Sequence, residues 1–192
     1  MIPASGPRPW LPEGFQFLSG LPEPARKRRV LMPIQVFADE SEGATPGAGN
    51  HFVMAGLIGF SEDWALFSDE WRIALKSGPH HLDYFKMKEA AGCSGQFFRW
   101  NKEDRDRKLI EFAAIINRYA KIVTWSVIDL VAHKKIWGAL PKPQSEPYFH
   151  PFQNTMLAAC FALWDAGHRE RFEMIFDQHV IFGPRARRWY PM

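Results

Sequence analysis

Residues 34–40 have the sequence Ile-Gln-Val-Phe-Ala-Asp-Glu, an apolar run that ends in two adjacent carboxylates, Asp39 and Glu40. The run is short, contains β-branched residues and is followed by a loop with Gly and Pro, which predicts a strand that ends at the acids. A carboxylate at the tip of a buried strand is costly unless a cation or a hydrogen-bond donor lies beside it. This stretch therefore predicts a sheet with a charged site at its edge.

Two later apolar runs also end in aspartate. Residues 123–129 read Val-Thr-Trp-Ser-Val-Ile-Asp, and residues 172–177 read Phe-Glu-Met-Ile-Phe-Asp. If the three strands lie side by side and parallel, Asp39, Asp129 and Asp177 meet at one edge of the sheet, where open α/β sheets bind ligands. Neighbouring carboxylates repel one another, and Mg²⁺ or Mn²⁺ bound between them relieves this repulsion. The pattern predicts a Mg²⁺ or Mn²⁺ site with these three aspartates as ligands.

The two adjacent acids cannot both point into such a site from an extended strand, because side chains alternate between its faces. We expect Asp39 to be the inner ligand and Glu40 to be an auxiliary ligand or a base that orients water. A paired-metal site of this kind activates water and stabilises the leaving oxygen of a phosphodiester. For each aspartate taken alone, a second interpretation stays open: it caps the turn or helix that follows its strand.

The remaining periodicity predicts an α/β layered domain with a mixed sheet of about five strands and helices on its faces. The helix starts are indicated by Ser61 and by Asn101 with Asp104 three residues later, and Gly167 is a C-terminal stop. The expected strands are residues 34–39, 51–60, 82–87, 121–129 and 172–177, and the expected helices are residues 61–76, 101–119 and 152–166.

Two lysines lie in the segment 82–87 and directly after it. Lys86 and Lys88 alternate with Phe85 and Met87, so on a strand they share one face and could bind a phosphate near the acids. The alternative is an edge strand that lysines protect from pairing with other chains.

Length and composition indicate one globular domain with a substantial core. The chain has 192 residues, of which 46% are hydrophobic and 15% aromatic. Seven of the 15 prolines fall within residues 1–33, so we expect residues 1–32 to be an extended Pro-rich segment and the domain to span residues 33–192. The net charge of +3 is too small to indicate a nucleic-acid partner by itself. Basic clusters at residues 26–29 and 185–188 could contact phosphates or could only aid solubility.

The two cysteines exclude a disulfide framework, and Cys160 lies in an apolar run that predicts a core position. The chain shows neither a secretory signal nor an apolar run of the length that spans a bilayer. These features predict a cytoplasmic protein without a membrane partner, and they leave the oligomeric state open.

Several segments resemble the family called the domain of unknown function numbered three thousand eight hundred. The family typically has a strand, then Asp-Glu-Ser-Gly, then an apolar strand, later a His-Phe-Lys segment and two further acidic strands. The matching segments of this chain are residues 36–41, 52–56, 84–89, 127–129 and 175–177. The resemblance covers residues 31 to 180, and the Asp-Glu-Ser motif at positions 39–41 is its distinctive part.

The family is similar to the ribonuclease H-like superfamily, so the resemblance implies a metal-dependent nuclease site built on strand-end acids. This chain departs from the family pattern at three places. Glu42 replaces the usual Gly, Asp83 and Tyr84 stand where a His is expected, and the sequence stops at Met192. Family members continue into a helix with an Ala-Asp pair, so the resemblance implies a truncated C-terminus that could lack one ligand.

We therefore expect a Mg²⁺- or Mn²⁺-dependent nuclease or phosphoryl-transfer domain that acts on nucleic acid. Asp39, Glu40, Asp129 and Asp177 are its expected catalytic residues, and Lys86 and Lys88 are the expected phosphate contacts. One alternative is a catalytically inactive module of the same fold that binds nucleic acid or protein. Another is a fragment that folds poorly because one helix is missing.

Overall fold

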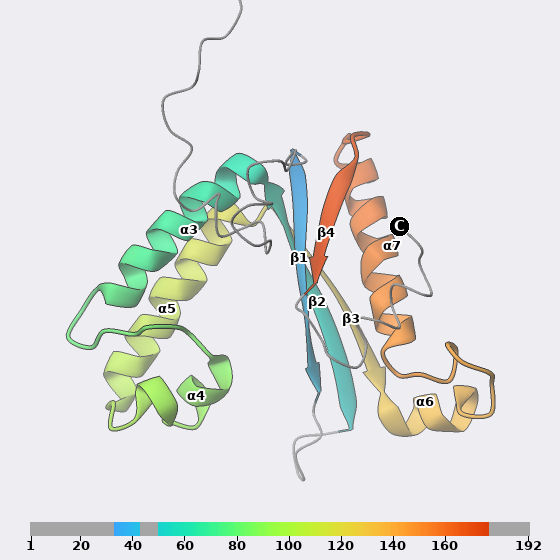
Figure 1. Cartoon of the computed structure of the whole chain (residues 1–192), viewed down its shortest axis with the longest axis horizontal. Coiled ribbons are helices and arrows are strands. Elements are labelled where there is room, and N and C mark those ends of the chain that lie inside the picture. Colours follow the sequence, from blue (N-terminus) through green and yellow to red (C-terminus); the bar gives the residue numbers. More distant parts are fainter. Residues whose placement is uncertain (1–32, 43–49, 177–192) are drawn as a thin grey trace, which may run out of the picture. The chain divides into compact units, whose positions relative to one another are not determined.

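The computed structural model describes residues 33–42 and 50–176. In these residues the chain is an α/β protein with a four-stranded mixed sheet and five α-helices, as the sequence predicts at this level (Figure 1). The chain divides into two compact units. We call Phe60–Ala120 the helical unit, and the described residues of Met32–Gly59 and Lys121–Met192 the sheet unit.

The strands are β1 (Ile34–Glu42), β2 (His51–Phe60), β3 (Ile122–Asp129) and β4 (Phe172–Phe176). The helices are α3 (Ser61–Lys76), α4 (Met87–Ala91), α5 (Lys102–Tyr119), α6 (Leu130–Trp137) and α7 (Phe149–Asp165), with a 3₁₀ turn at Gly95–Phe97.

The strand order of the sheet is β3-β2-β1-β4. Strand β4 pairs in parallel with β1, so that Phe176 lies beside Ala38, and β2 pairs antiparallel with β3, so that His51 lies opposite Asp129. The arrows of β1, β3 and β4 in Figure 1 point to the same edge of the sheet, the lower edge in that view. We call this the carboxyl edge.

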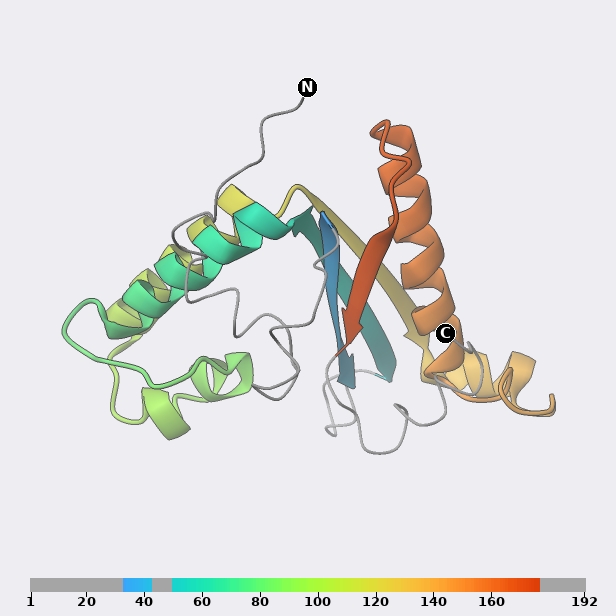
Figure 2. The same ribbon diagram turned by 45° about the horizontal axis from the view of Figure 1, so that its top comes forward.

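Helix α7 covers one face of the sheet, and Figures 1 and 2 both show it alongside β3. Along β1, Ile34, Val36 and Ala38 are buried on this face, and Gln35 on the other face is buried as well. The helix comes close to the sheet at Gly56, where an added Cβ would lie 3.4 Å from Thr155 Cγ2 of α7 and 3.0 Å from Thr124 Oγ1 of β3. On the opposite face of β3, Val123, Trp125 and Val127 are exposed, with Trp125 62% exposed.

The end of α7 agrees with its predicted stop signal. Gly167 has φ of +88°, a left-handed conformation that favours glycine over residues with a Cβ. The predicted core position of Cys160 is wrong, because its side chain is exposed. The buried stripe of α7 runs through Phe152, Thr155, Ala159 and Leu163, which leaves Cys160 on the outer side.

The helical unit is built on α3 and α5, which lie side by side and antiparallel in both views (Figure 2). The predicted cap of α5 is confirmed, since Asn101 Oδ1 accepts a hydrogen bond of 2.7 Å from the backbone N–H of Asp104. The core is aromatic. The ring of Phe112 stacks on Trp71 with centroids 4.3 Å apart and contacts Phe85 at 4.8 Å.

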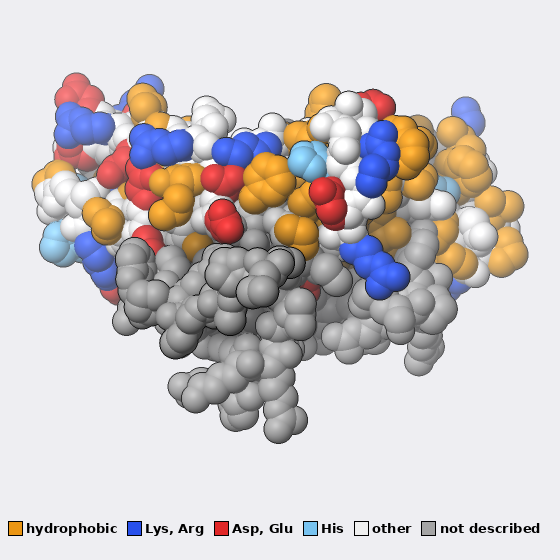
Figure 3. Space-filling model, turned by 90° about the horizontal axis from the view of Figure 1, so that it is seen from above, with side chains coloured by type: hydrophobic (Ala, Val, Ile, Leu, Met, Phe, Trp, Pro, Cys, Tyr) orange, Lys and Arg blue, Asp and Glu red, His pale blue; other side chains and the backbone are white. Residues whose placement is uncertain are grey.

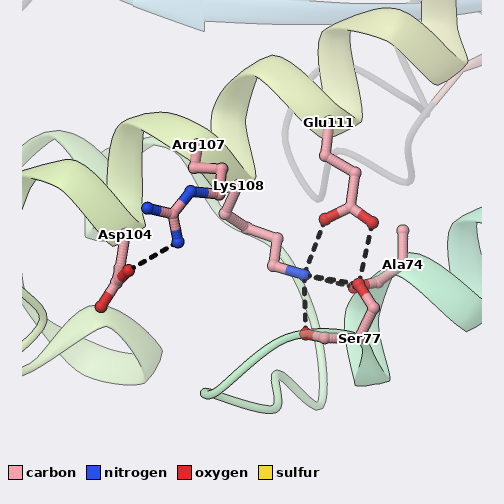
Figure 4. A network of polar contacts seen from close by, with 6 residues as sticks. All are labelled: Ala74, Ser77, Asp104, Arg107, Lys108 and Glu111. Carbon is pink, nitrogen blue, oxygen red and sulfur yellow. Dashed lines mark hydrogen bonds and ion pairs between the residues drawn. The ribbon is translucent and has the colours of Figure 1, made fainter.

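A buried lysine joins the two long helices. The Nζ atom of Lys108 on α5 donates hydrogen bonds to the backbone oxygens of Ala74 (2.7 Å) and Ser77 (2.9 Å), at the end of α3. It also binds Ser77 Oγ at 2.9 Å and Glu111 Oε2 at 2.8 Å (Figure 4). The lysine thus satisfies carbonyl groups that the end of a helix leaves without intrahelical partners.

The predicted strand at residues 82–87 is wrong, and the described residues contain four strands instead of five. Residues 82–86 form an irregular segment, and α4 begins at Met87. Leu82 is fully buried and Phe85 packs into the aromatic core of the helical unit. These two side chains fix the segment through packing, so its apolar residues need no partner strand.

Candidate functional site at the carboxyl edge

The predicted end of the first strand at the acids is wrong, because β1 continues through Asp39 and Glu40 to Glu42. Asp39 lies on the face of the sheet that α7 does not cover. Its neighbours Ala38 and Val36 are buried on the α7 side, and the alternation of the strand places Asp39 on the other side, where it is exposed. Its Oδ1 atom accepts a hydrogen bond of 2.9 Å from the backbone N–H of Glu40. The carboxylate is therefore accessible to a ligand from solution.

Asp129 ends β3 on the same face of the sheet as Asp39. It shares this face with the exposed residues Trp125 and Val127. Its Oδ1 atom accepts hydrogen bonds from the backbone N–H groups of Val131 (2.7 Å) and Ala132 (3.0 Å), and so caps α6. These two bonds hold the pKa of Asp129 below its usual value, and the nearby His51 adds a smaller effect in the same direction.

The two aspartates are not on neighbouring strands, because β2 lies between β1 and β3. The expectation that all three acidic strands lie side by side is therefore wrong in this respect. Two strand spacings separate β1 from β3 by about 10 Å. Two ions about 4 Å apart, each with bonds of about 2.1 Å to carboxylate oxygens, span much of this gap.

The third predicted ligand, Asp177, lies outside the described residues. It follows Phe176 in the sequence, and the parallel register aligns Phe176 with Ala38, the residue before Asp39. Among residues 33–42 and 50–176, no group of three or more His, Cys, Asp or Glu side chains is arranged to hold a metal ion. The described part of the chain thus supplies two of the three expected ligands.

The predicted division of roles between Asp39 and Glu40 agrees with their positions on the strand. Asp39 is exposed on the open face, whereas Glu40 is partly buried and belongs by alternation to the α7 side. On that side lies Tyr148, whose side chain is 2% exposed and packs against the ring of Phe52 with centroids 5.9 Å apart. Burial raises the pKa of Tyr148, and the negative charges of Glu40 and Asp39 raise it further. Tyr148 is therefore a neutral hydroxyl close to both acids.

Two residues near the acids were not found from the sequence. His51, the first residue of β2, lies directly opposite Asp129 and is exposed. Tyr148 immediately precedes α7. His51 could have been suspected only because it begins an apolar strand, and its proximity to Asp129 depends on the antiparallel register. Nothing in the local sequence of Tyr148 indicates that it lies near residues 39 and 40.

The argument that Lys86 and Lys88 share a strand face is wrong, because the segment is not a strand. Lys86 is the extended residue before α4, and Lys88 lies within that helix. Lys86 Nζ lies 5.1 Å from the ring centroid of Tyr84. Both lysines belong to the helical unit, whereas Asp39 and Asp129 belong to the sheet unit. Their role as phosphate contacts stays a prediction.

The described surface carries charges of both signs. On the face shown in Figure 3, Lys and Arg side chains alternate with Asp and Glu among hydrophobic side chains. The basic clusters at residues 26–29 and 185–188 lie outside the described residues. On this face, therefore, the described residues form no broad basic surface for a phosphate backbone.

Substitutions of Asp129 test its role as the cap of α6. Asn is as good an N-cap as Asp, whereas Ala is not. At neutral pH we expect Asp129→Ala to unfold at a lower urea concentration than the unaltered protein, and Asp129→Asn, which keeps the cap but loses the charge, to unfold between the two. Because its folded pKa is depressed, the contribution of the charge is present above the ordinary pKa of Asp and is lost as the pH falls below it. Equal loss in both variants at neutral pH would contradict the capping role.

The fold and the site define an α/β protein with exposed carboxylates at the carboxyl edge of a mixed sheet. No family model, curated protein or solved structure matches this chain. Within the described residues, none of the helices is both long enough and apolar enough to cross a membrane.

Proposed function

We propose that the chain is a ribonuclease H-like, metal-dependent nuclease or phosphoryl-transfer domain that acts on nucleic acid in the cytoplasm. Its resemblance to the domain of unknown function numbered three thousand eight hundred points to the same activity. The observation that carries the proposal is that β1 and β3 each place an exposed aspartate on one face near the carboxyl edge, Asp39 within the last residues of β1 and Asp129 at the end of β3. The parallel register of β4 adds support, since it aligns the residues that precede Asp39 and Asp177.

The chemistry of these donors fits a hard divalent cation. Exposed carboxylate oxygens are ligands that Mg²⁺ and Mn²⁺ prefer, and the lowered pKa of Asp129 keeps its carboxylate ionised. Asp39, Asp129 and Asp177 would hold the metal. Oδ1 of Asp129 is engaged with α6, which leaves Oδ2 for an ion. When bound, the ions would activate water and stabilise the leaving oxygen of a phosphodiester.

The residues of the chain that surround the acids have supporting roles in this proposal. Glu40, the neighbour of Tyr148, would orient the attacking water or act as an auxiliary ligand. Tyr148 would keep its proton at neutral pH because its pKa is raised, so it would act as a hydrogen-bond donor.

A second candidate is a module of the same fold that binds nucleic acid or protein without cleaving it. One observation favours it: Asp129 Oδ1 caps α6, a structural role that needs no metal. The two candidates differ in whether a divalent metal changes the outcome.

The test is a cleavage assay with the full chain on single-stranded RNA, single-stranded DNA and an RNA–DNA hybrid. Mg²⁺, Mn²⁺ or a chelator is added in parallel reactions. We expect Mg²⁺ or Mn²⁺ to stimulate cleavage of at least one polymer by at least about tenfold over the chelated reaction. Intact substrates in every reaction would contradict the nuclease proposal, and binding without cleavage would favour the second candidate.

A further inference from the structure

A cavity of about 290 Å³ opens beside Asp129, between α6, the first turns of α7 and the end of β3. Its wall is largely apolar and includes Ile128, Ile136 and Trp137. A few polar side chains also line the cavity, among them His133 and His150. An apolar cavity with a few placed polar groups is the usual form of a site for a small organic group.

His133 supplies a polar atom that the described residues leave unsatisfied. Its side chain is 5% exposed, yet its Nε2 atom has no hydrogen-bond partner in the described part of the chain. Burial lowers the pKa of His133, and the neighbouring His150 lowers it further, so the imidazole is neutral at pH 7. A buried polar atom without a partner is costly, and a ligand with a polar edge would remove that cost.

Aromatic rings form a second part of the wall. The ring of Trp137 lies against His150 with centroids 4.8 Å apart, and His150 lies 5.3 Å from His133. A hydrogen bond of 3.0 Å between His150 Nε2 and Gln144 O fixes the orientation of this ring. Trp137 is nevertheless 39% exposed, so part of its surface is open to a planar ligand.

We propose that this cavity binds an unpaired nucleobase of a single-stranded nucleic acid. The base stacks on Trp137, and a polar atom of its edge pairs with Nε2 of His133 after a small movement of the wall, because that atom is closed to solvent in the empty cavity. Asp129 belongs to both the cavity and the carboxyl edge, so a base bound here lies next to the proposed cleavage site. The inference rests on the proposed function, because that function makes nucleic acid the ligand.

Two other ligands fit the cavity less well. An aliphatic ligand would leave the Nε2 atom of His133 unsatisfied. A structural zinc ion needs four ligands, and the described residues bring no group of three His, Cys, Asp or Glu together. A base combines a planar face with a polar edge, which is the combination that Trp137 and His133 require.

The test measures the affinity of a short fluorescent single-stranded oligonucleotide by anisotropy, in chelator so that no cleavage occurs. We expect Trp137→Ala to weaken binding by roughly tenfold, the range for loss of one base–aromatic stack. Ile136→Glu, an exposed change at the cavity wall that leaves Trp137 in place, is expected to weaken it as well. The matched control is Trp164→Ala, at the far end of α7, which should leave the affinity unchanged although Trp164 is more exposed than Trp137, 61% against 39%.

Three further binding measurements test whether the cavity recognises a base that belongs to a strand. An oligonucleotide with abasic positions should bind the unaltered chain as weakly as the intact one binds Trp137→Ala. His133→Phe should reduce the difference in affinity among the four homopolymers. A mononucleotide that binds as tightly as the oligonucleotide would overturn the assignment to a strand.

Equal binding by Trp137→Ala, Trp164→Ala and the unaltered chain would also overturn the proposal. Two combinations of results distinguish failure of the base site from failure of the proposed nuclease activity. If no metal-stimulated cleavage occurs but the base-dependent binding disappears in Trp137→Ala, the base site stands and the catalytic proposal falls. If cleavage requires Asp39 while abasic and intact strands bind alike, the base site falls and the catalytic proposal stands.

Discussion

Replacing Asp39 by Asn is expected to reduce metal-stimulated cleavage by at least about a hundredfold. The amide has the same size and can still accept the hydrogen bond that the backbone N–H of Glu40 donates to Oδ1. It lacks the negative charge that a hard cation requires. The substitution should therefore lower the cleavage rate without changing the fold. The circular dichroism spectrum and the urea unfolding curve should match those of the unaltered chain.

The control for this variant is Asp165→Asn. Asp165 is also an exposed aspartate of the sheet unit, but it ends α7 at the opposite edge of the sheet in Figure 1. The control should cleave at the unaltered rate and respond to Mg²⁺ and Mn²⁺ in the same way. If Asp39→Asn retains full activity, Asp39 is not a metal ligand and the site proposed at the carboxyl edge is wrong.

Replacing Lys108 by Met is expected to lower the unfolding free energy of the helical unit by about 2–4 kcal/mol. The side chain of Lys108 is 6% exposed, and its ammonium group donates to two backbone carbonyls, a hydroxyl and a carboxylate. Methionine keeps the length of the side chain but leaves these acceptors without their donor. The end of α3 and the packing of α3 on α5 should both be weakened. Urea unfolding followed by circular dichroism measures the change.

Lys102→Met is the matched control, because Lys102 is exposed at the first position of the same helix. It should alter the unfolding midpoint little. The pKa of Glu111 gives a second readout: burial raises it, but hydrogen bonds from Lys108 and Ser77 together hold it below its usual value. It should rise in Lys108→Met and not in Lys102→Met. Similar midpoints for the two variants would show that the buried lysine is not a structural link.

The sequence was sufficient to locate the strands of the sheet unit. β1, β2, β3 and β4 were each predicted within a few residues, because each is a short apolar run rich in β-branched or aromatic residues. The cap of α5 and the stop of α7 were also found, since Asn101 and Gly167 act through their own local backbone. Signals that depend only on neighbouring residues can be read from one sequence.

Features that depend on packing could not be predicted in this way. The segment at residues 82–87 has strand-like composition, but Leu82 and Phe85 are held by the aromatic core of the helical unit. This is a tertiary effect that overrides local preference. Helix α6 was missed for a local reason: it has only eight residues, too few for a clear periodicity, and its start signal, Asp129, was interpreted first as a metal ligand and only second as a cap.

The candidate site was predicted in part. Asp39 and Asp129 do lie on one face of the sheet, which follows from the alternation of side chains, but only Asp129 ends its strand. The strand order was not predictable, so the antiparallel β2 between them was missed, and with it the position of His51. Tyr148 was missed because more than a hundred residues separate it from Asp39 in the sequence.

The most direct test is a crystal of the full chain soaked with Mn²⁺ and measured for anomalous scattering. The proposed metal site predicts an anomalous peak at the carboxyl edge, about 2.1 Å from a carboxylate oxygen of Asp39. The ion should also bind Asp129, or a second ion beside it should do so. The same peak should be absent from Asp39→Asn crystals. A fully soaked crystal with no manganese at either carboxylate, or with manganese bound only elsewhere, would contradict the account.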